Sequence, residues 1–588
     1  MIRSLLRKET YGAWHCLPVL AVFVLATLIT DAHYQGDTAD YVDSIVAHAA
    51  GRDYWFWEFG HVLWRPFGWL VMVVFRPLLN PLVGTDVRIQ ALHSVLAINW
   101  VAGVVTVAAL YGILNQLLGS PEVGEGFSRG DATAQRRAAA PLREKSWWAI
   151  NLAVIAFIFS HGFLNYSQTG CAYIPGLSLL TVGLYLLVQP GDTEKPQITR
   201  GLLAGVALGL AVCMWLPYVL AMPAIVLAPI VLRGSSKTNW KLVIGASLLC
   251  GVVAGLVYLM VMIGGVGISD LAGVKAWAAK TAGGPAQDKS LQRMVFGFAR
   301  SFIYMGNDGM LFKRFLVKDP LNPVTMFDLF RLSLWKIALF YLFIAALAIS
   351  LLRWSQNWRI LALLIINGLP IIGLAVFWQG GDIERYLGVY PVMFLSLVAC
   401  LSSDRSVWLL RYVLLVWIAA LVLTDTIGMA KFTLNKQQEE TAVRAAALQQ
   451  VLNDKSRVFA VTFQDDFVNF NRSFPFHPVN RHSFNPYAII AVGTTQAPVW
   501  RQDFLTKVEE AWDNGGDVWV SKRVFSQRPL ADWNWVEGDD KSVAWADVYK
   551  FFSQLEFSQS VGGDDGFALL TPSDRNRAVL RVLASEEK

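Results

Sequence analysis

Charged residues are scarce in this chain. Only 16% of its 588 residues are Asp, Glu, Lys or Arg, whereas 55% are hydrophobic, and the mean hydropathy is +0.43. Soluble globular proteins carry about 25% charged residues, so this composition excludes that class and predicts a membrane protein. Six runs lack any charge and reach the roughly 20 residues that span a hydrocarbon core. They are 11–30, 89–118, 146–191, 201–232, 242–269 and 360–381.

Cysteine is also rare. The chain has five cysteines, and each of them lies in or beside an apolar run: Cys16, Cys171, Cys213, Cys250 and Cys400. Free cysteine in such a setting packs as a small hydrophobic side chain. The cysteines therefore predict no disulfide framework and say nothing about function.

The apolar runs can be threaded through a membrane in one consistent way. The run 146–191 is predicted to be a helical hairpin that turns near "HGFLNYSQTG". The run 201–232 is predicted to be two short spans that meet near Pro217, because a proline ring disfavours a continuous helix. Three shorter runs complete the set: 337–352, 386–403 and 412–424. With the N-terminus in the cytoplasm and an uncleaved first helix, the sequence predicts about eleven transmembrane helices.

Lysine and arginine support this orientation. Under the positive-inside rule they gather in cytoplasmic loops, and the predicted inner loops are rich in both. These loops are 119–146, 190–200, 233–241, 353–359 and 403–411. Three large segments then lie on the outer side, namely 31–87, 265–335 and everything after 428, and we expect the functional residues among them.

The composition becomes that of a soluble protein after residue 428. The runs "VFAVTF", "YAIIAVG" and "DVWVSKRV" predict strands, and "QDFLTKVEEAWDNGG" predicts a helix that ends at glycine. We therefore expect an α-helical polytopic membrane module at 1–427, with outer loops 31–87 and 265–335. A C-terminal soluble α/β domain is expected at 428–588, on the extracytoplasmic side.

Three carboxylates follow the first span closely, Asp37, Asp40 and Asp43 in "GDTADYVDSI". On a helix they fall within about 120° of one another. Like charges so close raise at least one pKa, which makes a carboxylate a competent general base near neutral pH. The structural alternative is a solvated helix face with Asp37 as the N-cap residue, and the spacing alone leaves both open.

A second polar group follows in "RDYWFWEFGHVLWRPFGWL". Its aromatic residues are typical of an interfacial belt, which anchors a protein at head-group depth whatever its function. Glu58, His61 and Arg65 are predicted to share one helical face. They either belong to this anchor or line a site that faces the aspartates.

A third polar group lies at the outer end of the span 360–381, in "WQGGDIERYLGVYP". Arg385 there can bind a phosphate through two hydrogen bonds and stays charged at any relevant pH. The alternative is an arginine that pairs with Asp382 or reaches lipid head groups. Other candidates nearby are Glu384 and Tyr386, and the outer segment 265–335 adds the cations Arg293 and Arg300.

These features together resemble the GT-C superfamily of integral-membrane glycosyltransferases, which use polyprenyl-phosphate sugars, with a mannosyltransferase-like character. The resemblance covers roughly 10–427 and is carried by "GDTADYVDSI", "GVALGLAVCMWLPYVLAMPAIVL" and "GDIERYLGVYPV". In that superfamily the first outer loop carries an essential acid, which maps to Asp37, with Asp40 as second choice. The D-x-x-D spacing departs from D-x-D or E-x-D, so metal use and the identity of the base stay open.

The resemblance implies an inverting hexosyl- or pentosyltransferase. Asp37 or Asp40 would take a proton from an acceptor hydroxyl, and Arg385, Arg293 and Arg300 would bind the donor phosphate. The expected lining residues are Tyr41, Glu58, His61, Arg65, Asp382, Glu384 and Tyr386.

The same resemblance implies partners and a location. The expected partners are a polyprenyl-phosphate-linked sugar donor, a glycan, lipid or protein acceptor, and membrane lipid, but not nucleic acid. No cofactor is assigned, and a divalent metal ion stays open. The expected location is a bacterial inner membrane, with the active site and the C-terminal domain on the extracytoplasmic side.

Three other functions compete with this one. A lipid-linked glycan polymerase or ligase is also a polytopic enzyme with outer Arg and His clusters. A transporter normally places charged sites near the membrane midplane and often shows inverted repeats, whereas the spans here are nearly free of charge. A scaffold that presents the C-terminal domain would leave the aspartates dispensable.

Overall fold

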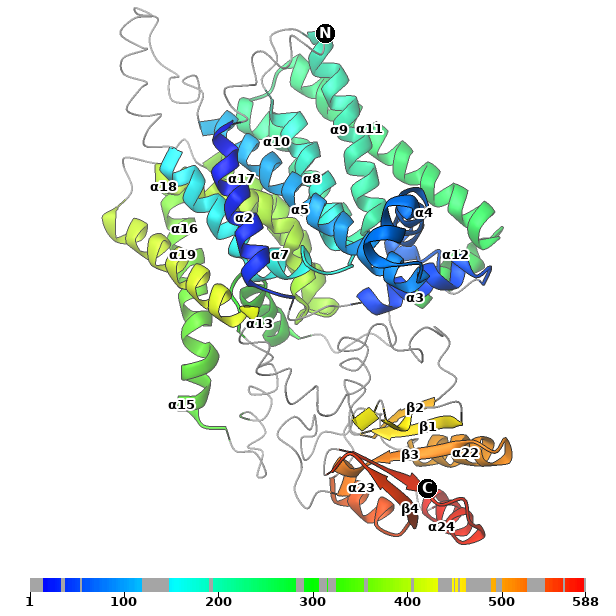
Figure 1. Cartoon of the computed structure of the whole chain (residues 1–588). Coiled ribbons are helices and arrows are strands. Elements are labelled where there is room, and N and C mark those ends of the chain that lie inside the picture. Colours follow the sequence, from blue (N-terminus) through cyan, green and yellow to red (C-terminus); the bar gives the residue numbers. More distant parts are fainter. Residues whose placement is uncertain are drawn as a thin grey trace, which may run out of the picture. The chain divides into compact units, whose positions relative to one another are not determined.

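The structure is a computed structural model of the full chain (Figure 1). It describes residues 14–32, 37–52, 55–118, 147–189, 194–281, 290–305, 315, 324–353, 358–402, 407–431, 447–448, 450–452, 455–461, 488–492, 500–525, 545–563 and 566–585. The chain divides into two compact units. The first comprises Met1–Met305 and Lys336–Lys431, and the second comprises Gly306–Trp335 and Phe432–Lys588.

The first unit is built entirely from helices in its described part. Its N-terminal half contains α2 (Leu17–Ile29), α3 (Thr38–Ala49), η2 (Phe59–His61), α4 (Trp64–Val83), α5 (Val87–Leu118), the helix Trp147–Phe159, α7 (His161–Tyr166), α8 (Tyr173–Val188) and α9 (Glu194–Met214). The rest contains η4 (Leu216–Ala221), α10 (Met222–Arg233), α11 (Lys237–Met260), η5 (Val261–Val266), α12 (Leu271–Thr281), α13 (Leu291–Phe302), α16 (Trp335–Leu352), α17 (Trp358–Phe377), η7 (Ile383–Val389), α18 (Tyr390–Ser402) and α19 (Trp408–Gly428). In the second unit, α15 (Met326–Leu329) and η6 (Phe330–Leu334) precede α16 in the chain.

Membrane-spanning character is confirmed. Within the described residues, nine helices are long and apolar enough to cross a membrane, and three shorter apolar helices accompany them. The hairpin predicted for 146–191 is present, because the chain turns through α7. The break predicted near Pro217 is present as well, since η4 separates α9 from α10.

The helix α4 is the main departure from the predicted threading. The sequence interpretation placed it in an outer loop, yet Trp64–Val83 is long and apolar enough to span. A search for charge-free runs missed it, because Arg65 and Arg76 interrupt its apolar sequence. The inner loop 119–146 lies outside the described residues.

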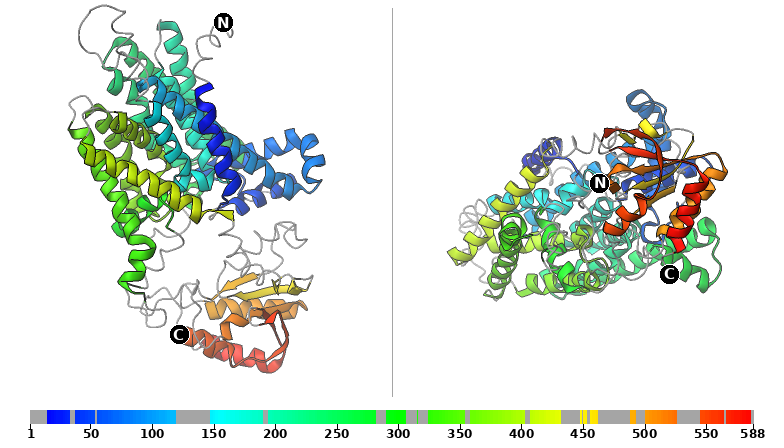
Figure 2. Two further views of the ribbon diagram at one scale, coloured as in Figure 1. Left: turned by 60° about the vertical axis from the view of Figure 1, so that its left-hand side comes forward. Right: turned by 90° about the horizontal axis from the view of Figure 1, so that it is seen from below.

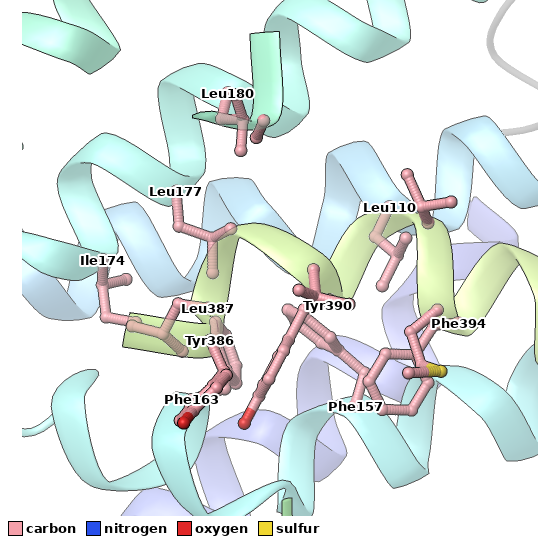
Figure 3. Packing of buried hydrophobic residues seen from close by; sticks show 14 of the residues in the cluster. Leu110, Phe157, Phe163, Ile174, Leu177, Leu180, Tyr386, Leu387, Tyr390 and Phe394 are labelled. Atoms are coloured by element: carbon pink, nitrogen blue, oxygen red, sulfur yellow. The ribbon is translucent and has the colours of Figure 1, made fainter. Parts of the chain in front are cut away.

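The helix α18 lies at the centre of the first unit. Its residues Tyr390 to Leu401 are all buried. A helix that is buried on all sides needs no polar face, and this sequence is accordingly apolar all round. Figure 3 shows Tyr390 and Phe394 beside Phe157, with Tyr386 and Leu387 of η7 next to Phe163. The Phe157 ring centroid lies 5.4 Å from that of Phe394 in an edge-to-face arrangement, which is favourable for aromatic pairs. This core holds η7 in place, the short 3-10 helix that carries Arg385.

The C-terminal end of α2 pairs with the C-terminal end of α19. Thr30 and Ala430 form an isolated antiparallel bridge, and the Asp31 amide donates to the Met429 carbonyl at 3.0 Å. Thr30 and Asp31, which follow α2, are therefore anchored to the end of α19.

The second unit contains a five-stranded sheet with the order β2-β1-β3-β5-β4. Its strands are β1 (Ser456–Val461), β2 (Ala488–Ala491), β3 (Asp517–Ser521), β4 (Phe557–Val561) and β5 (Phe567–Leu570). The pairs β1–β2 and β1–β3 are parallel, whereas β3–β5 and β4–β5 are antiparallel. The helices are α22 (Trp500–Asp513), α23 (Trp545–Phe552) and α24 (Asp574–Ser585).

The α/β character predicted for the C-terminal part is confirmed. The three predicted strands correspond to β1, β2 and β3, and the predicted helix corresponds to α22. Gly515 follows α22 with a φ of 69°, a conformation that favours glycine over other residues. The sequence interpretation did not include β4, β5, α23 or α24.

We predict that Gly297→Ala destabilises the helical unit. A Cβ at Gly297 would lie 2.0 Å from the Gly380 carbonyl oxygen, so α13 would have to separate from the turn 378–381. Forced overpacking of this kind costs about 1–3 kcal/mol, and the midpoint of thermal unfolding should fall. The matched control is Gly373→Ala in α17, where a Cβ meets no atom within 4 Å. Equal midpoints for the two variants would contradict the close approach of α13 to this turn.

Candidate active site

Asp37 stands at the start of α3, and its carboxylate does not cap that helix. It occupies the N-cap position but makes no side-chain capping hydrogen bond. Instead, its Oδ2 accepts hydrogen bonds from the hydroxyls of Tyr41 at 3.3 Å and Tyr173 at 3.4 Å. The N-cap alternative left open by the sequence therefore does not describe its side chain, which two phenols orient.

A chain of polar contacts continues from Tyr41. The Tyr41 hydroxyl lies 3.4 Å from His61 Nε2, and His61 Nδ1 lies 3.2 Å from Glu58 Oε2. Arg65 donates to the same Glu58 oxygen, and its guanidinium lies 4.6 Å from the Tyr41 ring centroid. Asp37 is thus connected to a buried acid, imidazole and guanidinium.

The expectation that Glu58, His61 and Arg65 share one helical face is wrong, although the three side chains do meet. Glu58 is extended, His61 ends η2 and Arg65 lies in the first turn of α4. Burial opposes ionisation of Glu58, but His61 and Arg65 outweigh burial and lower the pKa of its carboxyl to about 2. Arg65 therefore has a partner that is charged near neutral pH.

The other aspartates of α3 have different surroundings. Burial raises the pKa of the Asp43 carboxyl to about 6, despite its ion pair with Arg88 at 2.7 Å. Desolvation raises the pKa of Asp40, and the charge of Asp37 adds to the rise. Asp43 is held by a structural pair, whereas Asp40 lies within electrostatic reach of the cluster around Asp37.

The hairpin around α7 connects Asp37 with the segment that carries Arg385. Tyr173, whose hydroxyl contacts Asp37, packs its ring 4.7 Å from that of Tyr166. The Tyr166 hydroxyl in turn donates to Glu384 at 2.8 Å. Parts of the chain that are more than 300 residues apart therefore meet through two tyrosines.

Arg385 points inward and is held on several sides. Its side chain is only 10% exposed and lies 3.8 Å from a Glu384 oxygen and 3.9 Å from an Asp382 oxygen. It stacks on Trp378, with 3.8 Å between the guanidinium carbon and the ring centroid. It also donates to Gln379 Oε1. The contact with Asp382 considered from the sequence is present.

Gln379 supports Arg385 from a strained backbone. Its φ is 50°, a left-handed value that is uncommon for residues other than glycine and is tolerated where the surroundings impose it. The preceding Trp378 and the following Gly380 and Gly381 form the turn that closes over Arg385.

The cations of α13 act on the same region, and the Tyr386 hydroxyl there is engaged by a backbone carbonyl. Burial raises the pKa of Asp382, and the charges of Arg385, Arg300 and Arg293 oppose the rise while that of Asp37 adds to it. Arg385, Arg300, Arg293 and Asp37 therefore each lie within electrostatic range of Asp382. Tyr386 is fully buried, and its hydroxyl contacts the backbone carbonyl of Gly380 at 2.7 Å. Its role is to hold the turn in place.

Several contributors were not anticipated from the sequence. Tyr166, Tyr173, Trp215, Trp378 and Gln379 contact the candidate residues, and aromatic residues in a membrane protein give no signal that separates packing from function. The segment 265–335 also contains Lys289, Lys313, Arg314 and Lys318, which lie outside the described residues. Within the described ranges, no group of three or more His, Cys, Asp or Glu side chains is arranged to hold a metal ion.

Comparisons with known proteins bear on the fold. No family model matches the chain, and no curated protein matches it in sequence. ArnT from Cupriavidus metallidurans in the apo state is similar in structure, with a TM-score of 0.51 at 11% identity over 97% of this chain and 99% of that one. The chain therefore has the fold of this ArnT structure. The fold class expected from the sequence, an α-helical polytopic membrane protein with a C-terminal α/β domain, is confirmed.

Two further solved structures were found. ArnT from the same organism bound to undecaprenyl phosphate gives a TM-score of 0.49 at 11% identity over 96% of this chain and 98% of that one. An Archaeoglobus fulgidus oligosaccharyltransferase in complex with Zn and sulfate gives a TM-score of 0.47 at 14% identity over 94% of this chain and 73% of that one.

We predict that Glu58→Gln destabilises the protein in a pH-dependent way. The pKa of Glu58 lies near 2 instead of its ordinary 4.5, so its ionised form stabilises the fold above pH 4.5. That contribution, about 3 kcal/mol from the shift, is lost as the pH falls from 4.5 towards 2.

The measurement is the unfolding midpoint of the wild type and the variant between pH 7 and 3. The difference in unfolding midpoint between the wild type and Glu58→Gln should become smaller below pH 4.5. Glu556→Gln is the control, because Glu556 pairs with Arg575 on an exposed surface, where ion pairs contribute little. A Glu58→Gln difference that stays constant down to pH 3 would contradict the ionised Glu58–Arg65 pair.

Proposed function

We propose that the chain is an inverting membrane glycosyltransferase that moves a sugar from a polyprenyl-phosphate donor to an acceptor hydroxyl. Asp37 is the general base, and Arg385 binds the donor phosphate. One observation carries the proposal: an acid from the start of the helical unit and an arginine from near its end belong to one network, which Tyr173, Tyr166 and Glu384 connect.

The surroundings of Asp37 suit a base. Both phenols contact Oδ2, so the opposite oxygen, Oδ1, is the atom that we assign to take the proton. The acceptor oxygen then forms a bond to the anomeric carbon while the bond from that carbon to the phosphate oxygen breaks. The electron pair leaves with the phosphate, and the sugar inverts because attack comes from the opposite face. Asp40 is the second candidate base.

The surroundings of Arg385 suit a phosphate. Stacking on Trp378 and the hydrogen bond to Gln379 fix the guanidinium before a ligand arrives, and fixed donors stabilise the charge that develops on a leaving group. Arg300 and Arg293 are the further cations proposed here, since Arg65 is engaged by Glu58.

The membrane setting supports the donor class and the location that we propose. ArnT, which shares this fold in its apo form, has also been solved with undecaprenyl phosphate, and a ligand of that lipid-phosphate class is what we propose for this chain. A lipid-linked donor requires a site near a membrane surface. The distribution of Lys and Arg in the loops supports the extracytoplasmic side of a bacterial inner membrane.

We predict that Asp37→Asn abolishes transfer while the protein still inserts and folds. Loss of a general base costs about 10²- to 10⁴-fold in rate. The assay is transfer from a panel of synthetic polyprenyl-phosphate hexoses and pentoses to hydroxyls of an added membrane-lipid extract, with the elution profile as the check on folding.

The matched control is Asp43→Asn on the same helix, which removes a carboxylate engaged by Arg88 and should leave the rate within about threefold. A rate for Asp37→Asn close to that of Asp43→Asn would retire Asp37 as the base.

A further inference from the structure

A cavity of about 330 Å³ lies at the opposite end of α3 from Asp37. It is formed by α3, α4 and α5, and its lining includes His48, Ala49, Trp69, Met72, Arg76 and Gln90. His48 is eleven residues beyond Asp37, which corresponds to about 16 Å along a helix. The cavity is therefore distinct from the candidate active site.

A buried acceptor of a residue that lines this cavity lacks a donor. Gln90 is 1% exposed, and its Nε2 donates to Asn80 Oδ1 at 2.6 Å and to the Gly84 carbonyl at 2.7 Å. These bonds fix the orientation of the amide. The carbonyl oxygen, Oε1, has no hydrogen-bond partner in the described part of the chain. A buried polar atom left in this way costs about 1–3 kcal/mol, so the cavity favours a ligand that supplies a hydroxyl or ammonium donor.

A cation lies on the other side of the same cavity. Arg76 lines it from the middle of α4 and forms no ion pair with any other described residue. Its neighbours Val73, Val74 and Phe75 are 44%, 59% and 51% exposed. An arginine within an apolar stretch extends its charge to the nearest anionic group, so the cavity also favours an anion.

The setting of α4 identifies the source of such a ligand. Only 11% of the apolar window of α4 is buried, and Figure 2 shows α3 and α4, in blue, at an edge of the helical unit. A helix with so much exposed apolar surface contacts acyl chains in a membrane. Trp69 beside the cavity is a side chain typical of head-group depth. The ligand therefore comes from the bilayer.

We propose that this cavity binds the head group of an anionic membrane phospholipid of the phosphatidylglycerol type. The phosphate contacts Arg76, a head-group hydroxyl donates to Gln90 Oε1, and the acyl chains lie along the exposed apolar side of α4. His48, which stacks on Phe56 with 3.7 Å between ring centroids, forms a rigid wall. Such a lipid holds α4 and α3 at the membrane without taking part in transfer.

The test is native mass spectrometry of the full-length protein, purified in mild detergent and mixed with palmitoyl-oleoyl phosphatidylglycerol. The probe for comparison is phosphatidylcholine with the same chains, which is zwitterionic and has no head-group donor. The wild type should retain phosphatidylglycerol in preference.

Two variants probe the cavity independently. Arg76→Gln removes the cation, and Ala49→Phe fills the volume from an exposed position on α3. Each should weaken retention of phosphatidylglycerol at least about tenfold, as expected when a charge-assisted hydrogen bond is lost or the site is occupied. The matched control is Arg359→Gln, which removes an exposed arginine of α17 outside the cavity and should retain the lipid as the wild type does.

Three outcomes would overturn the proposal. Retention of phosphatidylglycerol by both variants at the wild-type level would mean that the lipid binds elsewhere. Retention of phosphatidylcholine by the wild type as strong as that of phosphatidylglycerol would mean that binding requires neither a net negative charge nor a head-group hydroxyl. Displacement of the lipid by inorganic phosphate alone would mean that the site takes a free anion.

Discussion

The contact between Tyr166 and Glu384 is the interaction on which the arrangement depends. Both residues are buried, and a buried carboxylate requires a hydrogen-bond donor or a counter-charge. Tyr166 provides the donor and Arg385 lies beside the other oxygen. Because Tyr166 belongs to the same hairpin as Tyr173, this contact also fixes the phenol that orients Asp37. The hairpin thus couples the start of α3 to η7, which precedes α18.

Some charged groups of the site are engaged in ion pairs with each other, whereas others are candidates for binding a donor phosphate. Glu58 keeps Arg65 in a buried pair, which removes one arginine from phosphate binding. Arg385 lies beside the carboxylates of Asp382 and Glu384, and Arg293 and Arg300 of α13 act on the same region. The acidic members of the site are Asp37, Asp40, Glu58, Asp382 and Glu384, and the basic members are Arg65, Arg293, Arg300 and Arg385. The two arginines of α13 therefore bring the site close to charge balance.

Sequence reasoning predicts the parts of this protein that follow from local chemistry. Apolar runs, the break near Pro217 and the three strands could be read directly, because helix and strand periods and proline sterics act within a few residues. The helix α4 could not be predicted in this way, because Arg65 and Arg76 interrupt its apolar run. Arg65 is buried in a pair with Glu58, and Arg76 lines a cavity. The direction of the Asp37 side chain and the contributions of Tyr166 and Tyr173 arise only when distant helices pack together, and no spacing encodes that. The assignment of Asp37 and Arg385 as base and phosphate ligand stays a prediction.

The most direct test of this account is an experimental structure of the full chain with a non-hydrolysable polyprenyl-phosphonate sugar. The account predicts that the phosphonate contacts the Arg385 guanidinium and that the anomeric carbon faces the side on which Asp37 Oδ1 lies, with one acceptor-sized space between them. A phosphonate bound away from Arg385, or a sugar whose anomeric carbon is separated from Asp37 by intervening protein, would contradict it.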